Sequence, residues 1–250
     1  MRRCTVVGCA VQRSVALDLF AVSFAANQPA RLARFWSELL GWTLAHDDML
    51  VPPDDTGFRI RFVVTQEPKV ELLRGHFDLT SASLEEQQRT VARALQLGGR
   101  HCHVGQLPEE PHVVLADPEG NEFCVIEPGN GFLSDCGFVG ALACDGTQQV
   151  GYFWSAALGW PLVWDQDEET AIRSPFGGPK ITWGGPPLTT RSSEGRLRFD
   201  LVPSADSDPP TEVERLLALG ASLTGDRGED GSHALLDPDG GQLRVLAHRS

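Results

Sequence analysis

The chain carries one ordered set of three motifs twice. Residues 35–44 (FWSELLGWTL) recur as residues 153–162 (FWSAALGWPL), an offset of 118 positions. HFDL at 76–79 returns as RFDL at 198–201, and LADPEGN at 115–121 returns as LLDPDGG at 235–241. This conserved order and spacing indicates an internal duplication, and the period is too long for a solenoid unit. We therefore expect a loosely ordered leader over residues 1–13 and two tandem domains of one fold, at 14–130 and 131–250.

Hydrophobic periodicity predicts the unit β-α-β-β-β twice within each repeat. In the first repeat, strands are expected near residues 15–25, 42–45, 58–65, 76–80, 100–104, 112–116 and 122–126, and helices over 27–40 and 83–97. In the second, strands are expected near residues 138–143, 160–164, 180–183, 198–202, 233–236 and 242–246, and helices over 150–158 and 211–219. Residues 129–131 (GNG) form the linker between the repeats.

Charge and cysteine content exclude several classes of protein. The net charge of −13 and the pI near 4.9 argue against partners such as nucleic acid or an anionic membrane. The first 13 residues superficially suggest a signal peptide, but Gln12 and Arg13 interrupt their apolar run and no cleavage site follows. Six cysteines without a CxxC pair predict neither a structural zinc site nor a disulfide scaffold. We expect a cytoplasmic protein.

The motifs resemble those of the vicinal-oxygen-chelate superfamily, which includes glyoxalase I, extradiol dioxygenases and fosfomycin and bleomycin resistance proteins. The resemblance lies in a helix ending FW..LLGW, a strand reading (R/H)FDL, and a final hairpin reading DPEGNEFCV at 117–125. It is strongest in the glyoxalase-like branch and covers both repeats. It implies an α+β fold of paired β-α-β-β-β modules, whose sheets curl around one cleft per duplicated domain.

In metal-dependent members of the superfamily, side chains on four strands of the cleft hold a divalent ion. The resemblance places these positions at Ala21, Arg61, His76 and Cys124 in the first repeat and at Val139, Arg198 and Arg244 in the second. A catalytic divalent site takes about three protein ligands and leaves one position open. The first repeat supplies at most His76 and Cys124, and the second supplies none. We therefore expect no metal ion and no other cofactor.

Two alternatives remain for the first-repeat positions. Glu122 lies on the strand face of Cys124 and completes, with His76, the only plausible metal-binding triad. Otherwise His76 is a polar residue of the cleft that pairs with Asp78 on the same strand face, and Cys124 is an inert thiol.

Other aromatic and histidine residues divide between core and cleft. The tryptophans of the FW and GW pairs are expected in the core, and the DPEG turn is expected to be structural. Trp164 and Trp183 have no tryptophan counterpart in the first repeat, and such aromatics can stack on a flat ligand. His112 and His233, each just before a strand, are candidates to face the cleft.

In the second repeat, Arg198, Asp200 and Arg244 replace His76, Asp78 and Cys124. Buried arginines need partners, so Arg198 either pairs with Asp200 as a structural element or binds an anion together with Arg244. We favour the structural pair, which leaves the ligand site around His76.

The sequence thus predicts a metal-free small-molecule binding protein with an aromatic-lined cleft. The alternative is an enzyme acting in the first-domain cleft, either a metal-dependent lyase or dioxygenase or a metal-free acid/base catalyst. A homodimer is possible on either prediction. The candidate ligand-binding residues are Arg61, His76, Asp78, His112, Glu122, Cys124, Trp183, Arg198 and Arg244.

Overall fold

A computed structural model describes residues 17–54, 57–69, 73–107, 109–185, 196–228 and 230–247. The leader expected over residues 1–13 lies outside these ranges. No helix among the described residues is both long enough and apolar enough to cross a membrane.

Within the described ranges, each repeat contains two helices and eight strands. The first comprises β1 (Leu17–Ala26), α1 (Pro29–Leu40), β2 (Thr43–Leu44), β3 (Met49–Val51), β4 (Arg59–Val64), β5 (Gly75–Leu79), α2 (Leu84–Gln96), β6 (Arg100–His101), β7 (Val113–Ala116) and β8 (Glu122–Val125). The second comprises β9 (Val139–Cys144), α3 (Gln148–Leu158), β10 (Leu162–Gln166), β11 (Glu169–Ser174), β12 (Gly177–Trp183), β13 (Leu197–Pro203), α4 (Pro209–Ala218), β14 (Ser222–Arg227), β15 (His233–Leu236) and β16 (Gln242–Val245).

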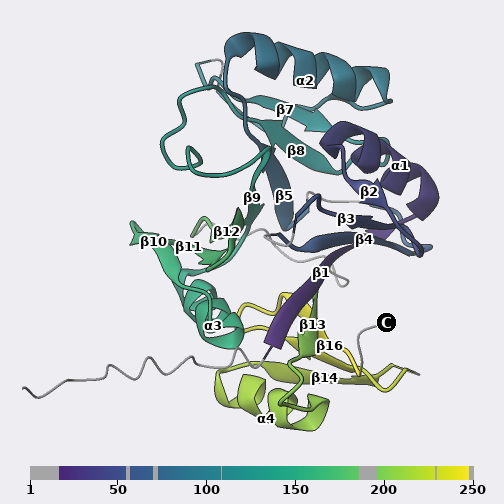
Figure 1. Ribbon diagram of the computed structural model, residues 1–250, viewed down its shortest axis with the longest axis vertical. Coiled ribbons are helices and arrows are strands. Elements are labelled where there is room, and N and C mark those ends of the chain that lie inside the picture. Colours follow the sequence, from purple (N-terminus) through teal and green to yellow (C-terminus); the bar gives the residue numbers. More distant parts are fainter. Residues whose placement is uncertain are drawn as a thin grey trace, which may run out of the picture.

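The strands form two eight-stranded sheets, and each sheet takes four strands from each repeat. Sheet A has the order β14-β15-β16-β13-β1-β4-β3-β2, and sheet B has the order β10-β11-β12-β9-β5-β8-β7-β6. Neither sheet closes on itself, since both have free edge strands. In Figure 1, β1 lies beside β13 of the other repeat and continues upward to β4 of its own repeat.

This pairing corrects the expectation of one cleft within each repeat. The two repeats join at antiparallel strand pairs, β1 with β13 and β5 with β9. A strand pattern specifies which face of a strand is buried, but not which equivalent strand will lie beside it. The α+β class and the duplicated β-α-β-β-β units are as expected.

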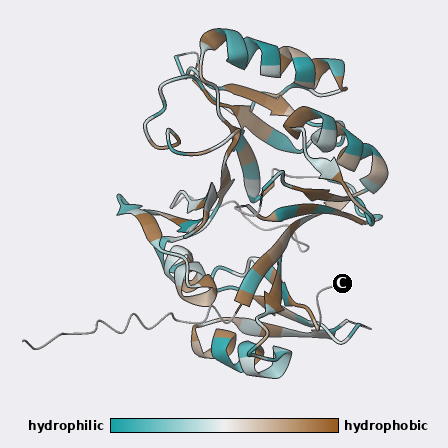
Figure 2. Ribbon diagram, viewed as in Figure 1, coloured by the Kyte–Doolittle hydropathy of each residue, from teal (hydrophilic) through white to brown (hydrophobic). Residues whose placement is uncertain are grey.

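Helix α1 shows how a local pattern sets the packing. Pro29 lies in the first turn, where the missing N–H costs nothing, and Gly41 ends the helix with a φ of 70°. Between them Leu32, Phe35 and Trp36 recur on one face and are buried. Helix α3 has no proline in its first turn, but it buries its own FW pair and ends at Gly159. A large apolar core lies between the helices and the sheets. In Figure 2, much of β1 is hydrophobic, whereas hydrophobic and hydrophilic residues alternate along α2 and α4.

The DPEG turns tie this core to the final hairpin of each repeat. The indole nitrogen of Trp36 donates to Asp117 (3.1 Å), and that of Trp154 donates to Asp237 (3.2 Å). Both carboxylates also accept backbone N–H groups of their own turns, and burial raises the pKa of Asp237 to about 6. The turns are therefore structural, as the sequence predicts.

Three strands were not predicted, namely β3, β11 and β14. Strands β3 and β11 follow tight turns whose central residues, Asp47-Asp48 and Asp167-Glu168, all have positive φ. Such turns usually carry Asn or Gly, so the acidic pairs gave no hairpin signal.

Candidate functional site

Strand alternation gives each sheet one face on the core and one inner, concave face. In sheet A the core takes Ile60, Phe199 and Leu243, so the residues between them in sequence point inward. In sheet B the core takes Phe77, Phe123 and Ile181 in the same way. Two small apolar clusters form the floors of these inner faces. They are centred on Phe20, Ala21, Val202 and Leu246 in sheet A and on Ile126, Leu133 and Ala141 in sheet B.

His76, Asp78 and Cys124 come together on the inner face of sheet B. Their ligand-capable atoms all lie within 4.8 Å of one another, and His76 Nε2 is 3.3 Å from Asp78 Oδ1. Burial lowers the pKa of His76, but hydrogen bonds and charge from Asp78 and Cys124 outweigh this effect and raise the pKa to about 10. The expected pairing of His76 with Asp78 is therefore present, and the pair favours an imidazolium.

Glu122 does not complete the triad that the sequence suggests. Its carboxylate accepts a hydrogen bond from Lys69 Nζ at 2.6 Å and lies 3.4 Å from the backbone nitrogen of Leu73. The pair is largely buried, with 13% and 12% of the two side chains exposed. Asp78, which lies opposite Cys124 in the β5–β8 ladder, takes the third place instead.

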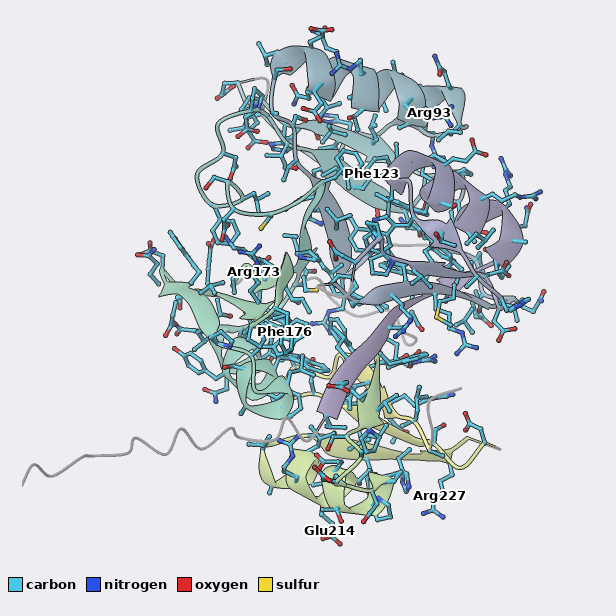
Figure 3. All side chains as sticks on the ribbon, in the orientation of Figure 1. Arg93, Phe123, Arg173, Phe176, Glu214 and Arg227 are labelled. Atoms are coloured by element: carbon cyan, nitrogen blue, oxygen red, sulfur yellow. The ribbon has the colours of Figure 1, made fainter. Side chains whose placement is uncertain are left out.

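The segment 132–136, which follows the linker, packs against the inner face of sheet B. Leu133 joins the apolar floor, and Lys180 of β12 donates to the backbone oxygen of Phe132 and to Asp135 (2.9 Å). Arg173 also pairs with Asp135, and its position at the end of β11 is labelled in Figure 3. The rings of Phe132 and Trp164 meet edge to face at 5.5 Å between centroids. The segment 132–136 and β10 thus supply the aromatic lining of this face.

Arg198 and Asp200 form the expected ion pair on the inner face of sheet A. Arg198 Nε donates to Asp200 Oδ1 at 2.7 Å, and Arg198 Nη2 lies 3.3 Å from Oδ2. Ser23 of β1 donates a third, short hydrogen bond to Oδ2. Asp200 is fully buried, so these donors satisfy a carboxylate that has no access to water.

Arg61 and Arg244 lie on the same inner face as Arg198. Arg61 pairs with Ser23 in the β1–β4 ladder, and Arg244 pairs with Asp200 in the β13–β16 ladder. Arg61 therefore belongs with the arginines of the second repeat, not with His76 of its own repeat. The sequence alone could not show this, because it follows from strand pairing between repeats.

Two predicted site residues lie elsewhere. Trp183 is 2% exposed and sits in the core, because it shares a strand face with Ile181. His112 lies before β7 beside Glu110, 3.7 Å away, outside the His76 cluster. The residues that sequence reasoning missed are Ser23, Phe132, Asp135 and Lys180. Only Lys180 carried a signal, as an inward lysine on a predicted strand.

The two inner faces differ in their fit to a divalent ion. Sheet A offers arginines at three of the positions where metal-binding relatives need ligands, and its one central carboxylate is already bonded, so a metal does not fit there. Sheet B offers nitrogen, oxygen and sulfur donors from three residues, the number that an open zinc-type site uses. The strands from the second repeat add Ala141 and Lys180, which lie side by side in the β9–β12 ladder and supply no further ligand.

Comparisons with known proteins agree with this architecture. The family model of the glyoxalase-like domain matches the chain twice, at residues 21–126 and 140–246. No curated protein sequence matches the chain. Glyoxalase I from Zea mays is structurally similar, with a TM-score of 0.61, 15% identity, and coverage of 93% of this chain and 92% of that one.

A point mutant of the maize enzyme gives a TM-score of 0.63 at 15% identity, with the same coverage of both chains. A Bacillus subtilis protein provisionally assigned as a dioxygenase gives 0.59 at 13% identity, covering 94% of this chain and 86% of that one. At these identities the structures show the fold alone. The two family matches span most of the sequence, and the chain belongs to the glyoxalase-like domain family.

Proposed function

We propose that the protein binds a small organic molecule on the inner face of sheet B, without a resident metal ion. The observation that carries this proposal is the cluster of His76, Asp78 and Cys124, three partly exposed polar side chains beside an apolar floor. Small-molecule sites combine apolar lining with a few convergent polar groups in this way. The imidazole supplies a donor and Asp78 an acceptor.

The aromatic pair at one end of this face adds to the argument. Trp164 meets Phe132 edge to face, and the Lys180 ammonium lies 4.5 Å from the Phe132 ring centroid. The indole nitrogen of Trp164 is buried without a hydrogen-bond partner. A flat ligand that carries an acceptor would contact the ring and satisfy this donor.

The second candidate is a metal-dependent enzyme at the same place. The 4.8 Å spacing of the His76, Asp78 and Cys124 donor atoms favours it. These three residues would hold the ion, which would act as a Lewis acid on a bound oxygen. The family resemblance supports this candidate, whereas Ala141 and Lys180 on the neighbouring strands offer no further ligand and count against it.

Elemental analysis combined with ligand screening separates the two candidates. We expect protein purified without chelator to contain well under one equivalent of zinc, nickel, iron or manganese. A thermal-shift screen of aromatic metabolites should give hits that are lost in His76→Ala and Asp78→Asn but kept in Arg34→Gln, an exposed control on α1. Stoichiometric metal that disappears in His76→Ala and Cys124→Ser would instead establish the enzyme candidate.

A further inference from the structure

We propose a second, separate site: the inner face of sheet A binds a small organic anion through Arg61 and Arg244. The apolar body of the ligand would lie on the floor formed by Phe20, Val202 and Leu246. This site does not depend on the proposed function of sheet B, since the two faces share no residue.

Arg244 is the strongest element of the argument. Its Nε is buried and has no hydrogen-bond partner, and no carboxylate of the described residues forms an ion pair with it. Asp200 lies directly opposite in the ladder, but its oxygens already accept from Arg198 and Ser23. A buried guanidinium nitrogen without an acceptor is costly. An incoming anion would supply that acceptor.

The carboxylate that pairs with Arg61 would compete only weakly with an incoming anion. Its nearest carboxylate is Asp47 at 3.8 Å, and 75% of the Asp47 side chain is exposed. An exposed pair at this distance contributes little and yields readily to another anion. Arg61 and Arg198 lie opposite Ser23 on its two sides, so both guanidinium groups flank the central strand β1.

Four arginines gather on this face of an acidic chain. The strands β4, β1, β13 and β16 direct Arg59, Arg61, Arg198 and Arg244 inward, against Asp18 and Asp200. The complete chain carries a net charge of −13. Asp230 accepts hydrogen bonds from Ser232, which lower the pKa of its carboxyl, and the charge of Arg244 lowers that pKa further. Arg198 already holds Asp200 and Ser232 already holds Asp230, so the guanidinium group of Arg244 is the one that an incoming anion would meet.

The floor specifies the rest of the ligand. Phe20, Ala21, Val202 and Leu246 form a separate buried cluster, with Met49 packed against it. Arg59 lies 4.8 Å over the Phe20 ring, which holds that guanidinium against the apolar surface. We therefore assign the ligand class as a carboxylate or phosphonate attached to an aromatic or aliphatic group. Arginine forks bind such groups through two parallel hydrogen bonds.

The test is calorimetric titration at low salt with phenylphosphonate, inorganic phosphate and benzylamine. We expect phenylphosphonate to bind more tightly than phosphate. Benzylamine, which carries an aromatic ring on a cationic group, should not bind. Arg61→Gln and Arg244→Gln should each weaken phenylphosphonate at least about tenfold, the loss of one charge-assisted contact. Arg34→Gln, an exposed control on α1, should bind as the wild type does.

A stability measurement distinguishes a binding arginine from a structural one. Because its buried nitrogen is unpartnered, Arg244→Gln should leave the unfolding midpoint of the ligand-free protein unchanged or raise it. Marked destabilisation by Arg244→Gln would show a structural role and overturn the proposal. Failure of phenylphosphonate and phosphate to bind, or binding that is lost only in His76→Ala, would overturn it too.

Discussion

The inner faces of sheets A and B share one scaffold but present opposite chemistry. Asp78 of sheet B and Asp200 of sheet A occupy the same place in the repeated HFDL and RFDL motifs, yet 18% of the first side chain is exposed and only 1% of the second. The difference comes from the residue two positions earlier. His76 leaves its aspartate partly open, whereas Arg198 and Ser23 enclose Asp200 in a bonded network. The same carboxylate therefore belongs to a candidate ligand site in one sheet and to the framework in the other.

This contrast depends on the exchange of strands between repeats. Ser23 comes from the first repeat and Asp200 from the second, and their hydrogen bond crosses the β1–β13 junction. Likewise, Lys180 of the second repeat reaches the face that carries His76 through the β5–β9 junction. Neither face exists within one repeat alone.

Separating the repeats should give the largest effect. Expressed alone, residues 14–130 would leave the central edges of β1 and β5 unpaired, and such edges aggregate or recruit another chain. We expect no monomeric folded domain by size-exclusion chromatography and NMR. Co-expression with residues 131–250 should restore a one-to-one complex. A well-dispersed monomeric spectrum from residues 14–130 alone would contradict the shared sheets.

Removing each of the two equivalent carboxylates should have the next largest effect, and the size of the effect should differ between sheet A and sheet B. Asp200→Asn removes the charge from a buried ion pair and should cost about 3 kcal/mol or more of the free energy of unfolding. Asp78→Asn alters a partly exposed pair and should cost less than about 1 kcal/mol. Urea denaturation of both variants measures the difference. Equal losses would mean that the two aspartates have the same structural role.

Titration of His76 should give a smaller effect that is confined to sheet B. Its pKa is raised from 6.5 to about 10, so its contribution to stability is present below pH 6.5 and is lost as the pH rises through about 10. With 38% of the side chain exposed, solvent screening limits this contribution to about 1 kcal/mol or less.

NMR of the imidazole protons in chelator-treated protein measures the His76 pKa directly. We expect a midpoint well above 7 that falls in Asp78→Asn. A midpoint near 6.5 that is unchanged in Asp78→Asn would show that the pair does not form in solution.

Local pattern was enough to predict most of the fold. The repeat, the helices ending at Gly41 and Gly159, and the DPEG turns all follow from short-range rules of capping, periodicity and turn chemistry. The pairing of β1 with β13 could not be predicted, because equivalent strands of the two repeats carry similar patterns and either partner would bury the same faces.

The candidate site was predictable only in part, for the same reason. The Arg198–Asp200 and His76–Asp78 pairs lie within single strands, so residue spacing predicted them. Arg61 was grouped with the wrong partners because its neighbours come from the other repeat. Trp183 was wrongly predicted to line the cleft, because the face of β12 that carries its side chain packs on the core.

The smallest expected effect tests whether sheets A and B respond alike to substitutions outside their inner faces. The turn before β3 in sheet A and the turn before β11 in sheet B place Asp48 and Glu168 at φ of 52° and 64°. Left-handed backbone costs a non-glycine residue about 1–2 kcal/mol, and the greater freedom of glycine in the unfolded chain offsets part of the gain. Asp48→Gly and Glu168→Gly should therefore each raise the free energy of unfolding by about 0.5–1 kcal/mol in urea denaturation. Similar gains would confine the difference between the sheets to their inner faces, whereas a gain in only one variant would show that the outer hairpins differ too.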